Sequence, residues 1–178
     1  MIVLDMDGVL VDFVGAANAL HGRADYVPSA YDYWTDWGLT DDQFWAPINA
    51  QGVDFWANIP VYPWAHELIE YAATFDDIAV ATATTTNHGE ATAGKIAAIR
   101  SIFGHRFTGF VVTPQKHLLA QKGRLLIDDH EPNCMRFIGY GGASTLFPRP
   151  WNSNRAIAHD PLPATKAAID IHMGYKGQ

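Results

Sequence analysis

Two carboxylates near the start of the chain, Asp5 and Asp7, could do chemistry together in the segment MIVLDMDGVLVDF. They follow the apolar run IVL and precede Gly8, so we expect a strand that ends here and turns. Residues i and i+2 of a regular strand point to the same face, whereas a turn gives each carboxylate its own direction. One carboxylate can then attack a substrate while the other moves protons.

Three further stretches end in polar residues that suit the same chemistry. Thr82 ends IAVAT, Lys116 comes shortly after GFVV, and Asp128 and Asp129 end RLLIDD. Open parallel sheets bind ligands beyond the carboxyl ends of their strands, so we expect all of these side chains to meet. Crowded carboxylates repel one another unless a cation lies among them, and the oxygen-binding ion Mg²⁺ fits best. A lysine and a hydroxyl beside such an ion indicate a bound phosphoryl group.

The elements that must position these residues alternate, after residue 60, between short apolar strands and helical segments. This alternation predicts an α/β protein with a Rossmann-like core, in which helices cover a central parallel sheet. Besides the first strand, the expected strands cover residues 78–82, 109–112, 124–128 and 144–147. The expected helices cover residues 63–75, 90–103 and 164–171, and two more begin near residues 114 and 131.

Residues 13–61 break this alternation and carry an unusual density of aromatic side chains. We expect them to form a small helical cap inserted after the first strand, while residues 1–12 and 62–178 form the core. About fifty inserted residues must bury something to stay folded, so most of the rings should form a small hydrophobic core and two or three should face the site. These aromatic residues are Tyr26, Tyr31, Tyr33, Trp34, Trp37, Phe44, Trp45, Phe55 and Trp56.

The composition is that of one folded domain: of 178 residues, 48% are hydrophobic and 17% are charged. The formal charge of -7 would repel a long polyanion, so a nucleic-acid polymer is not an expected partner. The apolar start is cut at Asp5 and no later stretch approaches about eighteen apolar residues, so we expect no membrane association and a cytoplasmic location. The single cysteine, Cys134, should be a small buried side chain in a reducing compartment.

DMDGVLVD, the threonine that ends IAVAT, Lys116 and LLIDD resemble the four motifs of the haloacid dehalogenase (HAD) superfamily, in their expected order. DMDGVLVDF with a short aromatic cap and LLIDD looks more narrowly like the 5'(3')-deoxyribonucleotidase family, with its bacterial and phage members. The resemblance implies that Asp5 is the nucleophile and Asp7 the general acid and base. It further implies a phosphate site of Thr82, Ala83 and Lys116, and Mg²⁺ held by Asp5, the main-chain carbonyl of Asp7, and Asp129, with Asp128 in support.

The implied activity is that of a Mg²⁺-dependent phosphomonoesterase of nucleotide metabolism, which hydrolyses small (deoxy)nucleoside monophosphates through an aspartyl-phosphate. By similarity, Phe13, Trp45 and Trp56 would enclose the base of the substrate. The second motif departs from the family pattern, because Ala83 and Thr84 stand where relatives typically have serine and proline. A main-chain N–H, or the hydroxyls of Thr84 and Thr85, would replace the missing donor.

Other functions stay open at this point. A phosphatase for another small phosphate ester, such as a sugar phosphate, would carry the same motifs. A receiver-like phosphoacceptor is disfavoured, because its threonine and lysine follow the phosphorylated aspartate, whereas here both precede LLIDD. A non-catalytic binding module is disfavoured because none of the chemical groups is missing. Base and sugar preference, the 5' or 3' position and the oligomeric state are not predicted.

Several charged side chains compete with these assignments. Lys122 lies nearer LLIDD than Lys116, but the position directly after a strand favours Lys116. Lys95 is expected on a helix surface and Arg149 in solvent, which is the usual place of both residue types. None of the eight histidines has a metal-ligand spacing, and His130 is expected in a loop near the site.

Overall fold

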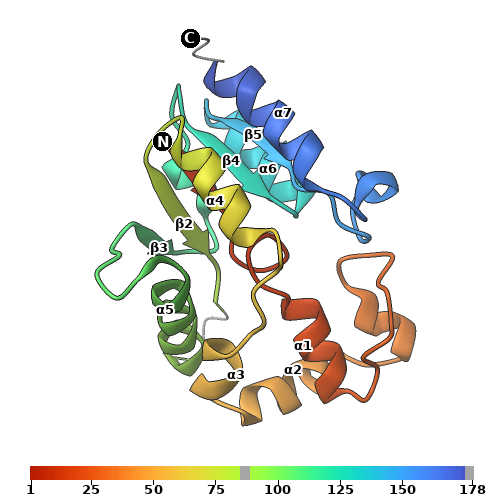
Figure 1. Cartoon of the computed structure of the whole chain (residues 1–178). Coiled ribbons are helices and arrows are strands. Elements are labelled where there is room, and N and C mark those ends of the chain that lie inside the picture. Colours follow the sequence, from red (N-terminus) through yellow and green to blue (C-terminus); the bar gives the residue numbers. More distant parts are fainter. Residues whose placement is uncertain (85–88, 175–178) are drawn as a thin grey trace.

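A five-stranded parallel sheet forms the centre of the molecule in a computed structural model that describes residues 1–84 and 89–174 (Figure 1). The strand order is β3-β2-β1-β4-β5, so the first strand lies in the middle. This confirms the predicted α/β architecture with a central parallel sheet. The strands are β1 (Ile2–Leu4), β2 (Ile78–Thr82), β3 (Phe110–Val112), β4 (Leu125–Asp128) and β5 (Ala143–Leu146).

The two faces of the sheet are covered by different helices, as the alternation of side chains along β1 requires. Ile2 and Leu4 belong to a large apolar cluster that includes Leu68 of α4 and Ile169 of α7. Val3 points the other way, into a small cluster with Phe137 of α6. The helices and 3₁₀ turns outside residues 13–61 are α4 (Ala65–Ala73), α5 (Gly89–Phe103), η2 (Lys116–Leu119), α6 (Glu131–Gly139), η3 (Arg155–Ile157) and α7 (Leu162–Met173).

Most element boundaries lie within two residues of those expected from the sequence, with one difference in type. The short helix expected near residue 114 is a 3₁₀ turn, η2, which begins only at Lys116. The tighter 3₁₀ geometry suits a connection of this length between β3 and β4. Cys134 is buried in α6, as expected.

Residues 13–61 contain four helical segments: α1 (Phe13–Leu20), η1 (Tyr33–Trp37), α2 (Asp41–Ala50) and α3 (Val53–Ala57). Thr40 and Gln43 form a reciprocal capping box at the start of α2, which satisfies two backbone N–H groups. Phe44 of α2 is fully buried, and its ring stacks on Trp34 with centroids 4.4 Å apart. Aromatic packing therefore supplies the hydrophobic core of this segment.

The chain enters and leaves this segment at neighbouring points. Val11 and Val61 form an antiparallel bridge, and the Tyr62 hydroxyl donates a hydrogen bond of 2.7 Å to Asp12 Oδ1. The same Asp12 oxygen accepts from the Gly15 N–H and so caps α1. The Asp12 carboxylate thus connects the start of this segment, its first helix and the chain that follows it.

Residues 13–61 also contact the remainder of the protein through α3, which packs closely on α5 (Figure 1). A Cβ at Gly94 of α5 would lie 2.5 Å from Trp56 Cβ and 2.6 Å from the Val53 carbonyl oxygen. Only glycine allows the two helices to approach so closely. Within the described ranges, no helix combines the length and apolar character needed to cross a membrane.

Candidate active site

The loop after β1 places Asp5 and Asp7 in different surroundings. The Asp5 N–H donates to the Ile127 carbonyl at 2.8 Å, so Asp5 still extends the strand. Gly8 then adopts a φ of 79°, a conformation that side chains with a Cβ rarely tolerate. A Cβ here would also lie 2.3 Å from Asp129 Oδ2. Glycine therefore allows the turn and brings this backbone against the end of β4.

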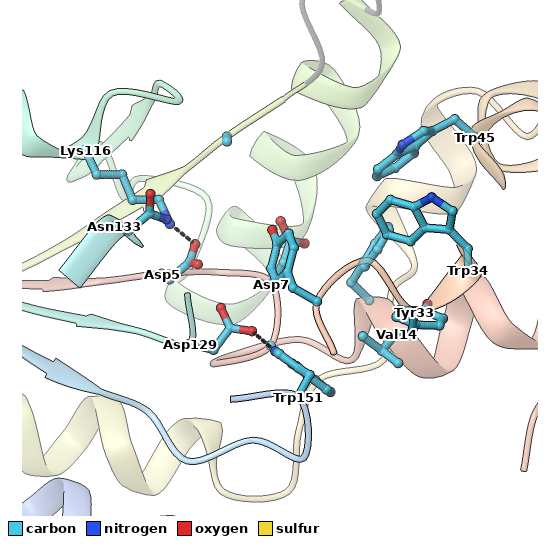
Figure 2. A pocket seen from close by; sticks show the side chains of 14 residues that line it. Asp5, Asp7, Val14, Tyr33, Trp34, Trp45, Lys116, Asp129, Asn133 and Trp151 are labelled. Carbon is cyan, nitrogen blue, oxygen red and sulfur yellow. Dashed lines mark hydrogen bonds and ion pairs between the residues drawn. The ribbon is translucent and has the colours of Figure 1, made fainter. Parts of the chain in front are cut away.

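A buried lysine lies at the centre of the acidic residues. Lys116 Nζ lies 2.6 Å from Asp5 Oδ1 and 2.7 Å from Asp128 Oδ2, and all three side chains are less than 10% exposed (Figure 2 shows the first pair). The Met6 N–H also donates to Asp5 Oδ1, at 2.6 Å. Because both donors engage Oδ1, the second oxygen of Asp5 is the one available for a substrate.

The two acids that end LLIDD have different partners. Both oxygens of Asp128 accept from Asn133 Nδ2 at 3.2 Å, and Oδ1 also accepts from the His130 N–H at 2.9 Å. Asp129 instead accepts from Trp151 Nε1 at 2.7 Å through Oδ2 (Figure 2). Asp128 is thus fully engaged within the protein, which favours Asp129 as the acid that faces a ligand.

Burial and mutual repulsion dominate the electrostatics of these acids. Burial and the negative charge of Asp128 raise the pKa of Asp129 to about 7, and the same two causes raise the pKa of Asp5. Burial lowers the pKa of Lys116, but the carboxylates of Asp5 and Asp128 outweigh it and raise that pKa above its ordinary value. One lysine does not neutralise three buried acids.

The donor set fits a hard divalent cation. Asp5, Asp128 and Asp129 each offer a carboxylate oxygen, and these atoms lie within 4.8 Å of one another. Oxygen-only donors of this kind are those that Mg²⁺ and Ca²⁺ prefer. A divalent ion would also remove the repulsion that raises the carboxyl pKa values.

Asp7 lies beside this cluster and is held by a second lysine. Lys95 of α5 donates to Asp7 Oδ2, and also to Thr82 Oγ1 at 3.2 Å and the Ala83 carbonyl at 2.6 Å. The expectation of a surface position for Lys95 is wrong: the residue is 3% exposed, because Asp7 and the ring of Trp56 cover its ammonium group. The fully buried Thr82 hydroxyl also contacts Asp7 Oδ2, at 3.5 Å.

A cavity of about 110 Å³ extends from the acids to the aromatic side chains of residues 13–61. Asp5, Asp129 and Lys116 lie at one end, and Tyr33, Trp34 and Trp45 lie at the other, as Figure 2 shows. The remaining lining residues are Asp7, Gly8, Phe13, Val14, Tyr31, Ala83, Asn133 and Trp151. The cavity therefore offers charge to one part of a ligand and flat apolar surface to another.

One polar atom at the aromatic end lacks a partner. Tyr33 is 2% exposed, and its hydroxyl makes no hydrogen bond to any residue that the structure describes. A buried hydroxyl without a partner is costly, so a ligand or water is expected to satisfy it.

No family model matches the sequence, and no curated protein matches it either. The fold does have counterparts among solved structures. A HAD family hydrolase from Deinococcus radiodurans R1, with bound phosphate and sodium, gives a TM-score of 0.57 at 12% identity, over 96% of this chain and 95% of that chain. A haloacid dehalogenase-like hydrolase from Streptococcus pneumoniae gives 0.56 at 18% identity, over 94% and 96%. This chain has the HAD fold.

A third structure with the HAD fold is the hydrolase YfnB from Bacillus subtilis, bound to magnesium. It gives a TM-score of 0.51 at 14% identity, over 82% of this chain and 85% of that chain. These likenesses establish the HAD fold and leave the narrower family open, because fold alone does not fix function.

Within this HAD fold, the rings predicted to bind a base contact one another. Phe13 lies 5.6 Å from both Trp45 and Trp56, measured between ring centroids, with interplanar angles of 28° and 10°. Two rings that enclose a third must lie about 7 Å apart, twice the contact distance of about 3.5 Å between carbon atoms. In this conformation a base does not fit between Phe13 and either tryptophan.

Two further expectations concerned the burial of Arg149 and the choice between Lys116 and Lys122. Arg149 is buried, not solvated: its guanidinium lies 4.4 Å from the Tyr62 ring centroid and 4.6 Å from that of Trp151. Cation–π contact and a hydrogen bond to the Tyr62 hydroxyl compensate part of the lost hydration, and Nε has no partner among the described residues. Lys122 is exposed, whereas Lys116 is in the site.

Of the hydroxyls considered as substitute donors for the second motif, that of Thr84 lies 3.3 Å from that of Thr92 on α5. Thr85 lies outside the described residues. Ala83 lines the cavity. His130 follows the acids in a loop, and its ring lies 4.2 Å from that of Tyr31.

Proposed function

We propose that this protein is a Mg²⁺-dependent phosphomonoesterase that hydrolyses nucleoside monophosphates, in particular deoxynucleoside monophosphates. The observation that carries the proposal is the pairing of buried Lys116 with Asp5, beside Asp129, at one end of a cavity whose other end is aromatic. The HAD fold and the bound phosphate of the Deinococcus hydrolase support phosphate chemistry at this edge of the sheet.

In this proposal Asp5 is the nucleophile. Lys116 and the Met6 N–H fix Oδ1, so the other oxygen attacks phosphorus and forms an aspartyl-phosphate as the ester oxygen leaves. Asp7 gives a proton to the leaving oxygen and takes one from the water that attacks the intermediate. Lys116 and the Ala83 N–H bind the phosphoryl oxygens. Thr82 is buried beside this site, where its hydroxyl contacts Asp7 Oδ2.

The metal would be held by the carboxylates of Asp5 and Asp129 and by the main-chain carbonyl of Asp7. Asp128 supports this arrangement through Lys116 and Asn133. When bound, Mg²⁺ supplies positive charge that neutralises the acids and the phosphoryl oxygens. The magnesium bound to YfnB, which has the same fold, supports this choice of ion.

The aromatic end of the cavity favours a nucleotide over a sugar phosphate. Stacking of a base on aromatic side chains stabilises binding by roughly 1 to 3 kcal/mol per base. Phe13 and Trp45 line this end of the cavity, and in the proposed complex the buried Tyr33 hydroxyl, which has no partner among the described residues, bonds to a polar edge of the base. A small phosphate ester without a base would leave these groups unused.

The test is phosphate release from deoxyribo- and ribonucleoside 5'- and 3'-monophosphates and from ribose and deoxyribose 5-phosphate, with Mg²⁺ or with EDTA. We expect nucleotide turnover that requires the metal and falls at least about 10⁴-fold in Asp5→Asn, because the nucleophile is lost. Asp25→Asn, at an exposed acid outside the site, is the matched control and should keep full activity.

The alternatives give different outcomes in the same assay. Equal efficiency toward sugar phosphates would favour a phosphatase of another small ester, with the same reacting residues and no base recognition. A lasting phosphoprotein without turnover would favour a receiver-like phosphoacceptor. Ligand binding that Asp5→Asn leaves unchanged, without any hydrolysis, would favour a binding module.

A further inference from the structure

Lys95 contacts Asp7 but belongs to none of the four motifs. Its ammonium group has three protons, and three acceptors surround it: Asp7 Oδ2, Thr82 Oγ1 and the Ala83 carbonyl. The ring of Trp56 covers a further side, with its centroid 4.8 Å from Nζ. Every donor of Lys95 is therefore occupied within the protein, which leaves none for a phosphate.

The two oxygens of Asp7 are used unequally. Oδ2 accepts from both Lys95 and Thr82, whereas Oδ1 is buried and makes no hydrogen bond to any described residue. Asp7 as a whole lines the cavity that also reaches Asp5. The Asp7 side chain is nevertheless 26% exposed, so its carboxyl group can meet a substrate in the cavity.

We infer that Lys95 is a positioning residue for Asp7: it holds Oδ2 and so fixes the orientation in which the carboxyl group faces the ester oxygen of the substrate. The inference rests on the proposed function. As the Asp5 oxygen bonds to phosphorus and the bond from phosphorus to the ester oxygen breaks, the proton on the Asp7 carboxyl group passes to that leaving oxygen. The Asp7 carboxylate then takes a proton from the water whose oxygen attacks phosphorus and releases Asp5.

The position of Lys95 also connects Asp7 to residues 13–61. Lys95 follows Gly94, where α3 and α5 touch, and Trp56 of α3 lies over its ammonium group. A carboxylate that is free to rotate would sample several rotamers, whereas one held by a lysine fixed on three sides keeps one orientation. Residues 13–61 thereby also help to orient the carboxyl group that transfers the proton.

The test compares two leaving groups in Lys95→Met and Lys95→Arg. A nucleoside alkoxide needs a proton as it leaves, whereas 4-nitrophenolate is a stable anion and does not. We expect Lys95→Met to lower the ratio of kcat for a deoxynucleoside 5'-monophosphate to kcat for 4-nitrophenyl phosphate about 100-fold, as misplacement of a catalytic group can do. Lys95→Arg, which keeps the charge, should restore part of this ratio.

Two controls separate positioning from general damage. Ile99→Val, at a buried position of the same helix, should leave the ratio unchanged. In an Asp7→Asn background, Lys95→Met should have no further effect on the ratio, because Lys95 acts through Asp7. If Lys95→Met does not fold, Lys95→Arg in both backgrounds provides the same comparison.

The outcomes distinguish the inference from the proposed function. Equal losses for both esters, or a further loss of the ratio in the Asp7→Asn background, would overturn the inference and leave the phosphatase intact. Absence of hydrolysis of either ester by the wild-type protein would overturn both.

Discussion

The two ends of the cavity are built in opposite ways. At the acidic end, the side chains come from the ends of neighbouring strands, and Lys116, Trp151 and Asn133 hold the carboxylates in place. At the aromatic end, the rings come from helical segments of residues 13–61, and the Tyr33 hydroxyl has no hydrogen-bond partner among the residues that the structure describes. In the proposed function the acidic end reacts and the aromatic end recognises the substrate, so substitutions at the two ends should have separable effects.

The largest effect is expected at the acidic end, from Lys116→Met. Removing one partner of a buried ion pair leaves two buried carboxylates uncompensated, which should lower the free energy of unfolding by about 3–5 kcal/mol. Chemical denaturation measures this change. Lys122→Met, at an exposed lysine six residues away, is the control and should stay within about 0.5 kcal/mol of the wild type. A Lys116→Met protein of wild-type stability would show that the pair is dispensable to the fold.

An intermediate effect is expected when the free energy of unfolding of the metal-free protein is measured as a function of pH. The folded-state pKa of Asp129 is about 7, above its ordinary value of 3.8, so the folded state binds this proton more tightly than the unfolded state. Stability from this group is fully present below about pH 4 and is lost as the pH rises through about 7. Urea denaturation at intervals across this range, with EDTA, should show the decline.

Mg²⁺ should reverse that trend, because a cation favours the ionised carboxylates. Stabilisation by Mg²⁺ should therefore be greater near pH 7.5 than near pH 5. Equal stabilisation at both pH values would indicate that the ion binds away from these acids.

The smallest effect is expected at the aromatic end, from Tyr33→Phe. If the hydroxyl bonds to the base, its loss should lower kcat/KM for the preferred nucleotide about fivefold, which corresponds to about 1 kcal/mol. Deoxyribose 5-phosphate, which has no base, should be much less affected. Tyr26→Phe is the control, because that hydroxyl bonds to Asp36 outside the cavity. Equal losses for both substrates would place Tyr33 outside base recognition.

The sequence predicted the acidic end better than the aromatic end, for a physical reason. Strand ends in a parallel sheet must meet at one edge, so Asp5, Lys116 and Asp129 could be brought together from their positions in the chain alone. No comparable rule predicts which side chains of helical segments outside a sheet will lie close together. The aromatic residues were visible, but the pattern did not indicate that Tyr33 and Trp34 would line the cavity.

Lys95 and Arg149 show where general tendencies fail. Both were expected in solvent, and both are buried because several partners compensate the lost water. A signal for Lys95 was available: Ala91, Ala98 and Ile99, at i−4, i+3 and i+4, are all buried, so the lysine lies within the apolar stripe of α5. No comparable pattern marks Arg149, whose aromatic neighbours come from distant parts of the chain.

The adjacent crossings at Val11 and Val61 bear on how such a protein can change over evolutionary time. Because the chain leaves and returns at the same place, residues 13–61 can be lengthened, shortened or exchanged without moving any strand of the sheet. Under the proposed function, substrate range can then diverge while Asp5 and Asp7 stay fixed. The contact of α3 with α5 limits this freedom, since any replacement must again meet the bare surface at Gly94 and cover Lys95.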